Sequence, residues 1–511
     1  MLSNLRKPGV LRQDVLASLV VFLVALPLCV GVAVASGVPA ELGLITGIVG
    51  GLVVGAMPGS VMQVSGPAAG LTVLVFEAVR EFGLGALGVI VLGTGLLQLA
   101  LGFARFGRWF RAISVSVVHG MLAGIGLILI FGQLYTMAGV KQPRGGVDKI
   151  AGVPGLIADV VTNRDALTAF AVGLSTIAVL VLWKKLPAKA QLVPAPLAAV
   201  ALATAVTAVA GLNIANVEVK GLSGAIQPPG LSDFSSLGSI GLIGTIVVFT
   251  LIASAETLFS AAAVDRMHDG PSTHYDKELV AQGVGNTVCG LLGALPMTAV
   301  IVRSSANVQA GAKTQLSRIL HGAWLLVFVV ALPAAIGLIP LAALAGVLVH
   351  AGCKLIPVQQ LGPLWREQRG ELAILVITAV GIVVTSMFEG VMIGILLAVV
   401  KSAWSTSKVS TEVTELADGR VLMRLTGSAT FLRLPHILDS LEALPKDRPV
   451  ELDLSELRHL DHACRAALEA WAARHSDVGT EPVQLRHSPP AAGAEAAAGR
   501  TAERSEPLAR L

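Results

Sequence analysis

Charged residues are scarce in this chain of 511 residues. Asp, Glu, Lys and Arg make up 14% of it, against about 25% in ordinary soluble domains. Hydrophobic residues make up 54%, and the mean hydropathy is +0.77. This composition excludes an ordinary soluble protein and predicts a polytopic membrane protein. The formal net charge of +4 is explained by loop residues and indicates no nucleic acid partner.

Cysteine is also scarce. Cys29, Cys289, Cys353 and Cys464 are scattered, and three of them lie in or beside apolar runs. Neither CxxC spacing nor paired histidines accompany them, so we expect apolar packing rather than a disulfide or a metal site. The sequence also lacks a nucleophile paired with a base, a phosphate-binding loop and a metal-ligand cluster. We therefore expect no enzymatic activity and no bound cofactor other than a coupled ion.

Long apolar runs dominate the first 405 residues. Many have the roughly 17–25 residues that a helix needs to cross a hydrocarbon core of about 30 Å. We predict an all-α transport domain over 1–405 with fourteen membrane-spanning segments. They are 15–36, 42–56, 66–79, 85–103, 113–131, 165–183, 192–210, 240–262, 279–294, 298–310, 318–338, 340–353, 371–386 and 388–404. The third and the tenth are too short and too interrupted by Gly and Ser to cross as regular helices.

Positive charges are distributed unequally over the loops. With an even number of spans both termini share a side, and the loops assigned to that side hold most of the Lys and Arg residues. They are Arg6, Lys7, Arg12, Arg105, Arg108, Arg111, Lys184, Lys185, Lys189, Lys313, Arg318, Lys354, Arg366 and Arg369. The opposite side holds chiefly Lys141, Arg144, Lys149, Arg164 and Lys220. The positive-inside rule therefore predicts a multi-pass protein of the cell (inner) membrane with both termini in the cytoplasm.

The composition changes after about residue 405. We predict a short cytoplasmic α/β domain over 406–486 and a disordered tail over 487–511, which has no apolar periodicity. The elements expected in the domain are strands at Val421–Leu425 and Val450–Leu454, a loop at Leu457–Asp461, helices at Pro435–Leu444 and Cys464–His475, and the start of a strand at Gln484.

Two short segments of the transport domain resemble each other. Met57–Gly66 and Leu295–Ser304 match Pro58 with Pro296 and Val64 with Val302 when one is slid onto the other. Each follows an apolar span and opens one of the two interrupted segments. Broken hydrophobic segments at corresponding places in two halves indicate the binding site of a transporter near the membrane midplane.

The residues around these breaks are suited to an anion. A helix that begins at the midplane presents unpaired N–H groups and a partial positive charge. Gly66 and Ala68 permit close approach to the backbone, and Pro67 suits a first helical turn. Arg303 can hold an oxyanion bidentately, and Ser65 and Ser304 can donate hydroxyl protons. The predicted substrate-binding residues are Ser65, Gly66, Pro67, Ala68, Val302, Arg303 and Ser304.

These residues also have structural interpretations. Arg303 could bind a carboxylate or a helix C-terminus without touching substrate. Ser65 and Ser304 could serve helix packing, as serines do in membranes. The functional interpretation is favoured for Arg303 because an intramembrane charge is expensive unless it is used.

A second intramembrane charge lies at Glu256, and Ser260 follows one turn later on the same helix face. If this face lines the pocket, Glu256 can carry a coupled proton, ligate sodium together with Ser260, or neutralise Arg303. Because a nearby Arg303 would repel sodium, we place a proton or charge balance ahead of it. A purely structural ion pair remains an alternative.

Three segments of the transport domain resemble a known family: Gln63–Gly70, Pro296–Asn307 and Ala310–Thr314. They are similar to the SulP (sulfate permease) inorganic anion transporters, and Val450–Asp461 resembles the STAS domain that ends most members. The likeness runs from about residue 12 to 486. It implies two inverted repeats of seven spans, core and gate domains, and a homodimer. It also implies substrates such as sulfate, bicarbonate, chloride or small dicarboxylates.

The predicted function is secondary active transport of small inorganic or carboxylate anions, of the sulfate or bicarbonate class, by alternating access with proton or sodium symport. The alternatives are a passive anion channel on the same scaffold and a membrane sensor that signals through the C-terminal domain. Expected partners are the anion, the lipid bilayer and a second copy of the chain. The loop Asp461–Cys464 lacks a hydroxyl that could be phosphorylated, so we expect the STAS-like domain to dock or to stabilise a dimer.

Overall fold

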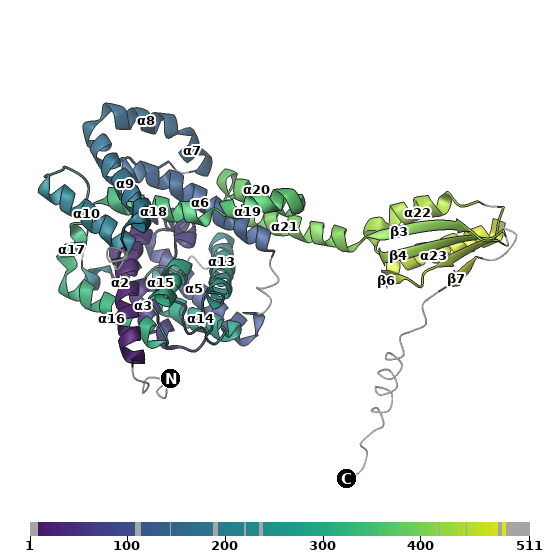
Figure 1. Cartoon of the computed structure of the whole chain (residues 1–511), viewed down its shortest axis with the longest axis horizontal. Coiled ribbons are helices and arrows are strands. Elements are labelled where there is room, and N and C mark those ends of the chain that lie inside the picture. Colours follow the sequence, from purple (N-terminus) through teal and green to yellow (C-terminus); the bar gives the residue numbers. More distant parts are fainter. Residues whose placement is uncertain are drawn as a thin grey trace, which may run out of the picture. The chain divides into compact units, whose positions relative to one another are not determined.

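The computed structural model describes residues 9–107, 114–143, 145–187, 193–218, 221–234, 239–417, 419–445, 447–478 and 483–486. The chain divides into two compact units, Met1–Ile395 and Leu396–Leu511, called here the helical unit and the C-terminal unit. Figure 1 labels their elements. The division falls inside helix α21 (Met387–Thr406). The tail predicted over 487–511 lies outside the described residues.

The helical unit is built from helices because a bilayer requires every backbone polar group to be paired inside the protein. The helices are α2 (Val10–Ala35), α3 (Ala40–Leu52), α4 (Thr72–Phe82), α5 (Leu84–Phe103), α6 (Val115–Met137), α7 (Gly146–Ala151), α8 (Val153–Thr162), α9 (Arg164–Leu182), α10 (Ala195–Val209), α11 (Leu222–Ala225), α12 (Leu231–Phe234), α13 (Ile240–Asp265), α14 (Tyr275–Leu291), α15 (Ile301–Gln309), α16 (Leu316–Ala331), α17 (Pro333–Gly337), α18 (Leu341–Leu355), α19 (Val358–Glu367), α20 (Arg369–Val384) and α21. Short 3₁₀ turns are η1 (Val54–Ala56), η2 (Ala69–Leu71) and η4 (Trp183–Lys185), and the two strands are β1 (Ser65–Pro67) and β2 (Met297–Ala299).

Seven helices in the described part of the chain are long and apolar enough to cross a membrane, and four shorter apolar helices accompany them. Each of the predicted spans overlaps a helix of the structure. Helices α7, α8, α11, α12 and α19 were not predicted. The count of fourteen crossing segments and the inverted repeat remain predictions.

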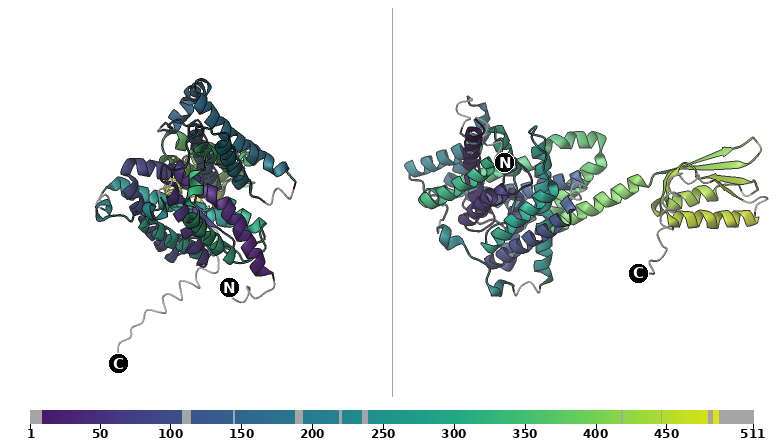
Figure 2. Two further views of the ribbon diagram at one scale, coloured as in Figure 1. Left: turned by 90° about the vertical axis from the view of Figure 1, so that its left-hand side faces the viewer. Right: turned by 90° about the horizontal axis from the view of Figure 1, so that it is seen from below.

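Helix contacts fall largely into two sets, and Figure 2 shows the bundle from two further directions. One set joins α2, α3, α5, α13, α14, α15 and α16, with α5 and α14 in the most extensive contact. The other joins α6, α9, α10, α18 and α20. Helix α2 also touches α10 and α18, so it lies where the two sets meet.

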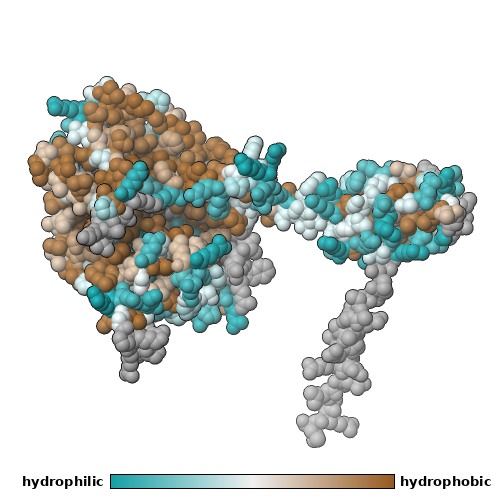
Figure 3. All heavy atoms as spheres, in the orientation of Figure 1, coloured by the Kyte–Doolittle hydropathy of each residue, from teal (hydrophilic) through white to brown (hydrophobic). Residues whose placement is uncertain are grey.

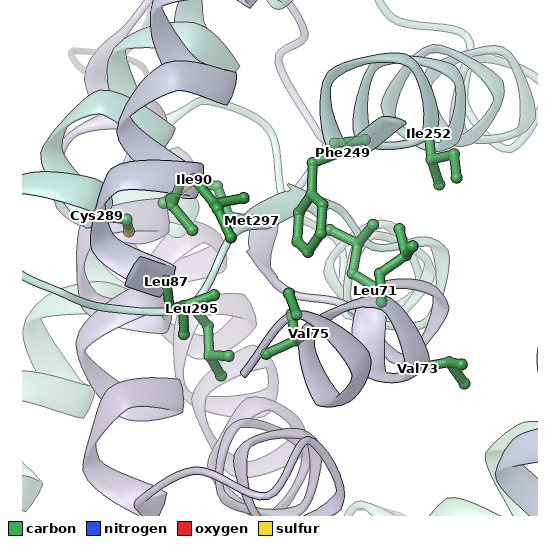
Figure 4. Packing of buried hydrophobic residues seen from close by; sticks show 14 of the residues in the cluster. Leu71, Val73, Val75, Leu87, Ile90, Phe249, Ile252, Cys289, Leu295 and Met297 are labelled. Carbon is green, nitrogen blue, oxygen red and sulfur yellow. The ribbon is translucent and has the colours of Figure 1, made fainter. Parts of the chain in front are cut away.

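The largest apolar core surrounds the two strands. In Figure 4, Phe249 of α13 lies beside Leu71 and Val75, and Met297 of β2 lies near Ile90 of α5. In a bilayer such side chains stabilise the fold through close van der Waals packing rather than by leaving water. This core fixes the positions of the helices that begin at the strands.

Apolar side chains also cover the outside of the helical unit, as the brown surface in Figure 3 shows. Val209 is 90% exposed, Ile240 88% and Phe103 73%. Exposed apolar surface on this scale marks contact with an apolar environment. It fits a lipid-facing surface, in agreement with the composition.

The C-terminal unit is a five-stranded sheet with two main helices. Its elements are β3 (Val409–Glu415), β4 (Val421–Ala429), η7 (Phe431–Arg433), α22 (Leu434–Glu442), β5 (Val450–Asp453), β6 (Leu457–Leu460), α23 (His462–Val478) and β7 (Gln484–Arg486). The strand order is β3-β4-β5-β7, with β6 paired to β4. Only the β3–β4 pairing is antiparallel. Val421, Met423 and Leu425 alternate into the core, as the period of a strand requires.

Most elements of the C-terminal unit match the sequence-based expectation, but Leu457–Leu460 is a strand and not the predicted loop. Its pairing with β4 satisfies backbone groups that a loop would leave to water. Asp461 then ends the strand and accepts hydrogen bonds from the N–H groups of Cys464 and Phe431, at 2.7 and 2.6 Å. These bonds lower the pKa of Asp461. The carboxylate is thus part of the fold of this loop.

Candidate anion-binding site

The two strands of the helical unit pair with each other across a large sequence separation. β1 and β2 run antiparallel, with Gly66 opposite Thr298. The N–H of Val300 extends the pairing by donating to the carbonyl of Val64 at 2.9 Å. β1 leads through η2 into α4, and β2 leads into α15. Two helices therefore begin at one strand pair, and the first N–H groups of each have no partner within their own helix.

The structure corrects the alignment of the two similar segments. Matching their side chains equated Val64 with Val302, but Val64 precedes a strand whereas Val302 lies inside α15. The structural counterpart of Ser65, the first residue of β1, is Met297, the first residue of β2. Arg303 and Ser304 thus belong to the first turn of α15. The repeated pattern located both breaks but gave the wrong register.

Three polar side chains on one face of α14 hold the strand pair. Glu278, Gln282 and Asn286 are spaced four apart, and they point along one helix face. Gln282 Nε2 donates to Ser65 Oγ at 2.6 Å and to Glu278 Oε1 at 3.0 Å. Asn286 accepts from the N–H of Met297 at 2.7 Å and donates to its carbonyl at 3.1 Å. These residues were not predicted, although polar residues repeated every four positions in an apolar span signal them.

Asn286 also connects three helices. Its Nδ2 donates to Gln98 Oε1 on α5 at 2.7 Å, and Gln98 Nε2 donates to Ser254 Oγ on α13 at 3.2 Å. We predict that Asn286→Ala lowers the free energy of unfolding by about 1–3 kcal/mol, because both backbone groups of Met297 lose their partner. Thermal unfolding of the purified protein in detergent measures the loss. Gln359→Ala, on the exposed side of α19, is the control, and an equal melting temperature for both variants would contradict the prediction.

Arg318 is not where the sequence predicts it. It was counted among the cytoplasmic loop charges, but only 2% of it is exposed. Its Nη1 and Nη2 donate to the carbonyls of Val54, Gly55, Met57, Ser60 and Gln63. This irregular segment leaves carbonyls unpaired inside the protein, and one guanidinium with several donors satisfies them. Arg318 therefore fixes the chain that leads into β1.

Arg303 is fully buried beside β1. Its Nη2 donates to the carbonyl of Pro67 at 3.2 Å, and Cys29 of α2 lies beside the guanidinium. A Cβ atom at Gly66 would collide with Nη1, so the cation lies directly against the glycine backbone. Nε and Nη1 are buried without a hydrogen-bond partner in the described structure. Buried donors of a charged group are costly when unpaired, and an oxyanion would satisfy them.

The other predicted residues also lie at the strand pair, but they differ in whether their polar groups are free to bind an anion. Ser304 Oγ accepts from the N–H of Val64 at 2.9 Å and donates to the carbonyl of Val300 at 2.8 Å, so its hydroxyl proton serves the fold. Ser65 Oγ accepts from Gln282. Gly66, Pro67 and Ala68 are buried at the start of the first helix, whereas Val302 is 39% exposed at the start of the second.

Glu256 lies at the same strand pair but away from Arg303. Its carboxylate oxygens lie 2.6 and 2.7 Å from where a Cβ atom of Gly70 would be, and Thr298 lies beside it. Its Oε2 has no partner among the described residues, and no ion pair with Arg303 is found there. Ser260, one turn later, is 2% exposed. The structure therefore gives no support to neutralisation of Arg303 by Glu256.

Comparisons with known proteins agree with this architecture. A family model described as the sulfate permease family matches residues 11–378. The chain belongs to this family. It is a family of transporters rather than enzymes. The match does not include the C-terminal unit, whose strands nevertheless fit a STAS-like sheet.

Relatives of this sulfate permease family chain include transporters named for sulfate and for bicarbonate. The putative sulfate transporter YvdB of Bacillus subtilis is 26% identical over 403 residues, covering 78% of this chain and 74% of the relative. The bicarbonate transporter BicA of Synechocystis is 26% identical over 494 residues, covering 90% and 85%.

Solved structures show the same fold. Murine Slc26a9, an anion transporter in an inward-facing state, aligns with a TM-score of 0.78 at 15% identity, covering 97% of this chain and 88% of that one. The transmembrane domain of a cyanobacterial BicA gives a TM-score of 0.65 at 23% identity, covering 77% and 98%.

Proposed function

We propose that this protein is a secondary active transporter of small inorganic or carboxylate anions, of the sulfate or bicarbonate class. The observation that carries the proposal is the strand pair at which two helices begin beside the buried, partly unpaired guanidinium of Arg303. Helix N-termini and an arginine are anion-binding groups, and an anion in this place would satisfy both. The relatives named for sulfate and bicarbonate transport support the same substrate class.

Alternating access is the proposed mechanism. The strand pair belongs to the helix set that contains α3, α13 and α14, and the set of α6, α9, α10, α18 and α20 forms a separate packing group. We propose that the first set moves as a rigid core against the second, which acts as a gate. The bound anion would travel with the core, because the site is held almost entirely by core helices.

Coupling is assigned to Glu256, whose carboxylate lies beside Thr298, and to Ser260, which follows one turn later on the same helix. A carboxylate with neighbouring hydroxyl groups can hold a proton or a sodium ion. Arg303 contacts Gly66 and Pro67 whereas Glu256 contacts Gly70, so the two side chains do not share a contact that would block a cation at Glu256. Both ions therefore remain candidates for symport.

Uptake by reconstituted protein tests this function. Labelled sulfate and bicarbonate are offered to proteoliposomes under imposed proton or sodium gradients, with protein-free liposomes as the control. We expect saturable uptake that accumulates one of the anions beyond equilibrium when one gradient is present. A large anion conductance without accumulation would indicate the channel, and saturable binding without uptake would indicate the sensor. Either result would contradict secondary active transport.

The remaining assignments rest on the loop charges and on the family resemblance. We propose that the protein resides in the cell membrane with both termini in the cytoplasm and that it forms a homodimer. The C-terminal unit is proposed to be a short STAS domain that docks or stabilises this dimer. Its loop at Asp461 supports a structural role, because the carboxylate is already bound by Cys464 and Phe431.

A further inference from the structure

Helix α19 joins α18 to α20, and its apolar side chains are left on the surface of the helical unit. Helix α18 ends at Leu355, and the extended backbone at Ile356 leads the chain into α19. No residue of α19 is buried. Val358 is 65% exposed and Trp365 is 61% exposed. The helix therefore lies outside the apolar core that the structure describes.

The side chains of α19 divide into two faces. The apolar face recurs at intervals of three and four residues, as one side of a helix does, and consists of Val358, Leu361, Leu364 and Trp365. The polar face lies opposite, is exposed, and consists of Gln359, Gln360, Arg366 and Glu367. Charged side chains are costly at the depth of the hydrocarbon core. We therefore do not expect α19 to continue the membrane crossing of α18.

Helix α19 has little stability of its own. It has 10 residues, and helices shorter than about 12–15 residues are marginal in water. Pro363 lies inside it and removes one backbone hydrogen bond, and the neighbouring Gly362 is a poor helix former. The helix contacts α20, but this contact leaves Val358 and Trp365 exposed. A further partner that buries the apolar face would stabilise the helix.

The surroundings of α19 identify this partner as lipid. The adjoining helix α20 contributes to the lipid-facing surface, where Val380 is 52% exposed and Val384 58%. Tryptophan is enriched where the hydrocarbon core meets the headgroups, which is the position of Trp365 if α19 follows the membrane surface. The guanidinium of Arg369 lies 5.6 Å from the centre of the Trp365 ring, so a cation accompanies the indole. A cation at this level is complementary to headgroup phosphates.

We propose that α19 is an interfacial helix whose apolar face docks on membrane lipid, at the boundary between the acyl chains and the headgroups of one leaflet. Val358 and Trp365 enter the acyl region, and Arg369 faces the headgroup phosphates. The polar face of α19 stays in water. This contact with lipid does not depend on anion transport.

Spin labels on single cysteines test this contact in the full-length protein in phospholipid vesicles. The exposed Cys353 is first replaced by Ser, and this protein, whose other cysteines are buried, is the blank. The labelled sites form two matched pairs of neighbours, one from each face: Val358→Cys with Gln359→Cys, and Trp365→Cys with Arg366→Cys. Label accessibility is measured to oxygen, which concentrates among acyl chains, and to a water-soluble nickel chelate. Val380→Cys on α20 is the lipid reference, and Thr414→Cys on β3 is the water reference.

We expect the oxygen-to-nickel accessibility ratio to be at least roughly threefold higher on the apolar face than on the polar face, because an interfacial helix buries its apolar face ~5–10 Å into the boundary. Equal nickel accessibility on both faces would overturn the proposal, since the helix would then lie in water. Shielding of the apolar face from both reagents would also overturn it, because protein, such as a second copy of the chain, would then cover that face. The melting temperature of each labelled protein checks its fold, and Leu361→Cys replaces Trp365→Cys if loss of the indole unfolds the protein.

Discussion

Arg303→Ala should abolish saturable anion uptake while the protein keeps its fold. The guanidinium supplies two buried donors that no protein group satisfies in the described structure, and hydrogen bonds to a charged group contribute about 1.5–3 kcal/mol. Loss of one or two such bonds lowers anion affinity roughly ten- to hundredfold or more. Anion binding to the purified variant and uptake into proteoliposomes measure the effect.

Two further variants separate the role of the charge from that of its geometry. Arg303→Lys keeps the charge but loses the planar fork, so an intermediate affinity is expected. Arg366→Ala removes an exposed arginine on α19 and should leave uptake unchanged. If Arg303→Ala binds and transports the anion like the wild type, Arg303 has no part in the site.

Glu256→Gln should remove the dependence of uptake on the coupling gradient. The substitution keeps the shape of the side chain but takes away its charge and its titration, so neither a proton nor a sodium ion is held as before. The accumulation ratio should fall to that of passive exchange, while anion binding at the strand pair persists because Arg303 is not the partner of Glu256. Uptake under separate proton and sodium gradients measures this.

Ser260→Ala distinguishes the two ions. If sodium is coupled, the loss of one oxygen ligand should raise the sodium concentration needed for half-maximal uptake. If a proton is coupled, Ser260→Ala should behave nearly like the wild type. Glu367→Gln, exposed on α19, is the matched control. Persistence of both gradient responses in Glu256→Gln would show that this carboxylate is structural.

The breaks in the third and tenth spans could be predicted from the sequence, but their pairing could not. Gly, Ser and Pro interrupt both apolar runs, and interruption of this kind is a local property. The register of β1 against β2 depends on hydrogen bonds such as that between Val300 and Val64, which join residues far apart in the chain. Similar side chains in Met57–Gly66 and Leu295–Ser304 therefore gave the wrong equivalence.

The charged and polar residues show a second limit. The sequence predicts Arg318 to be a loop charge because it begins a predicted span. In the structure it is buried, and its guanidinium donates to five carbonyls of the segment before β1. The spacing of Gln282 and Asn286 marks one polar helix face, but it does not identify what that face contacts. Their partners, Ser65 and Met297, are known only once the strands are placed.

The separation of Arg303 from Glu256 could not be predicted either. The topology brings both side chains to the same strand pair, but it does not say which backbone position each one contacts. Which residue each one contacts depends on the directions of α13 and α15, and these place Glu256 at Gly70 and Arg303 at Gly66. Under the proposed function, this arrangement would place anion binding and ion coupling on different residues of the same strand pair.

The most direct test of the central claim is a structure of the protein with its transported anion, using selenate as a heavy-atom substitute if sulfate is the substrate. We predict anion density at the strand pair, within hydrogen-bond distance of Arg303 and of the first N–H groups of the two helices that begin there. Density for the anion at any other place in the helical unit, with this position empty at saturating concentration, would contradict the account.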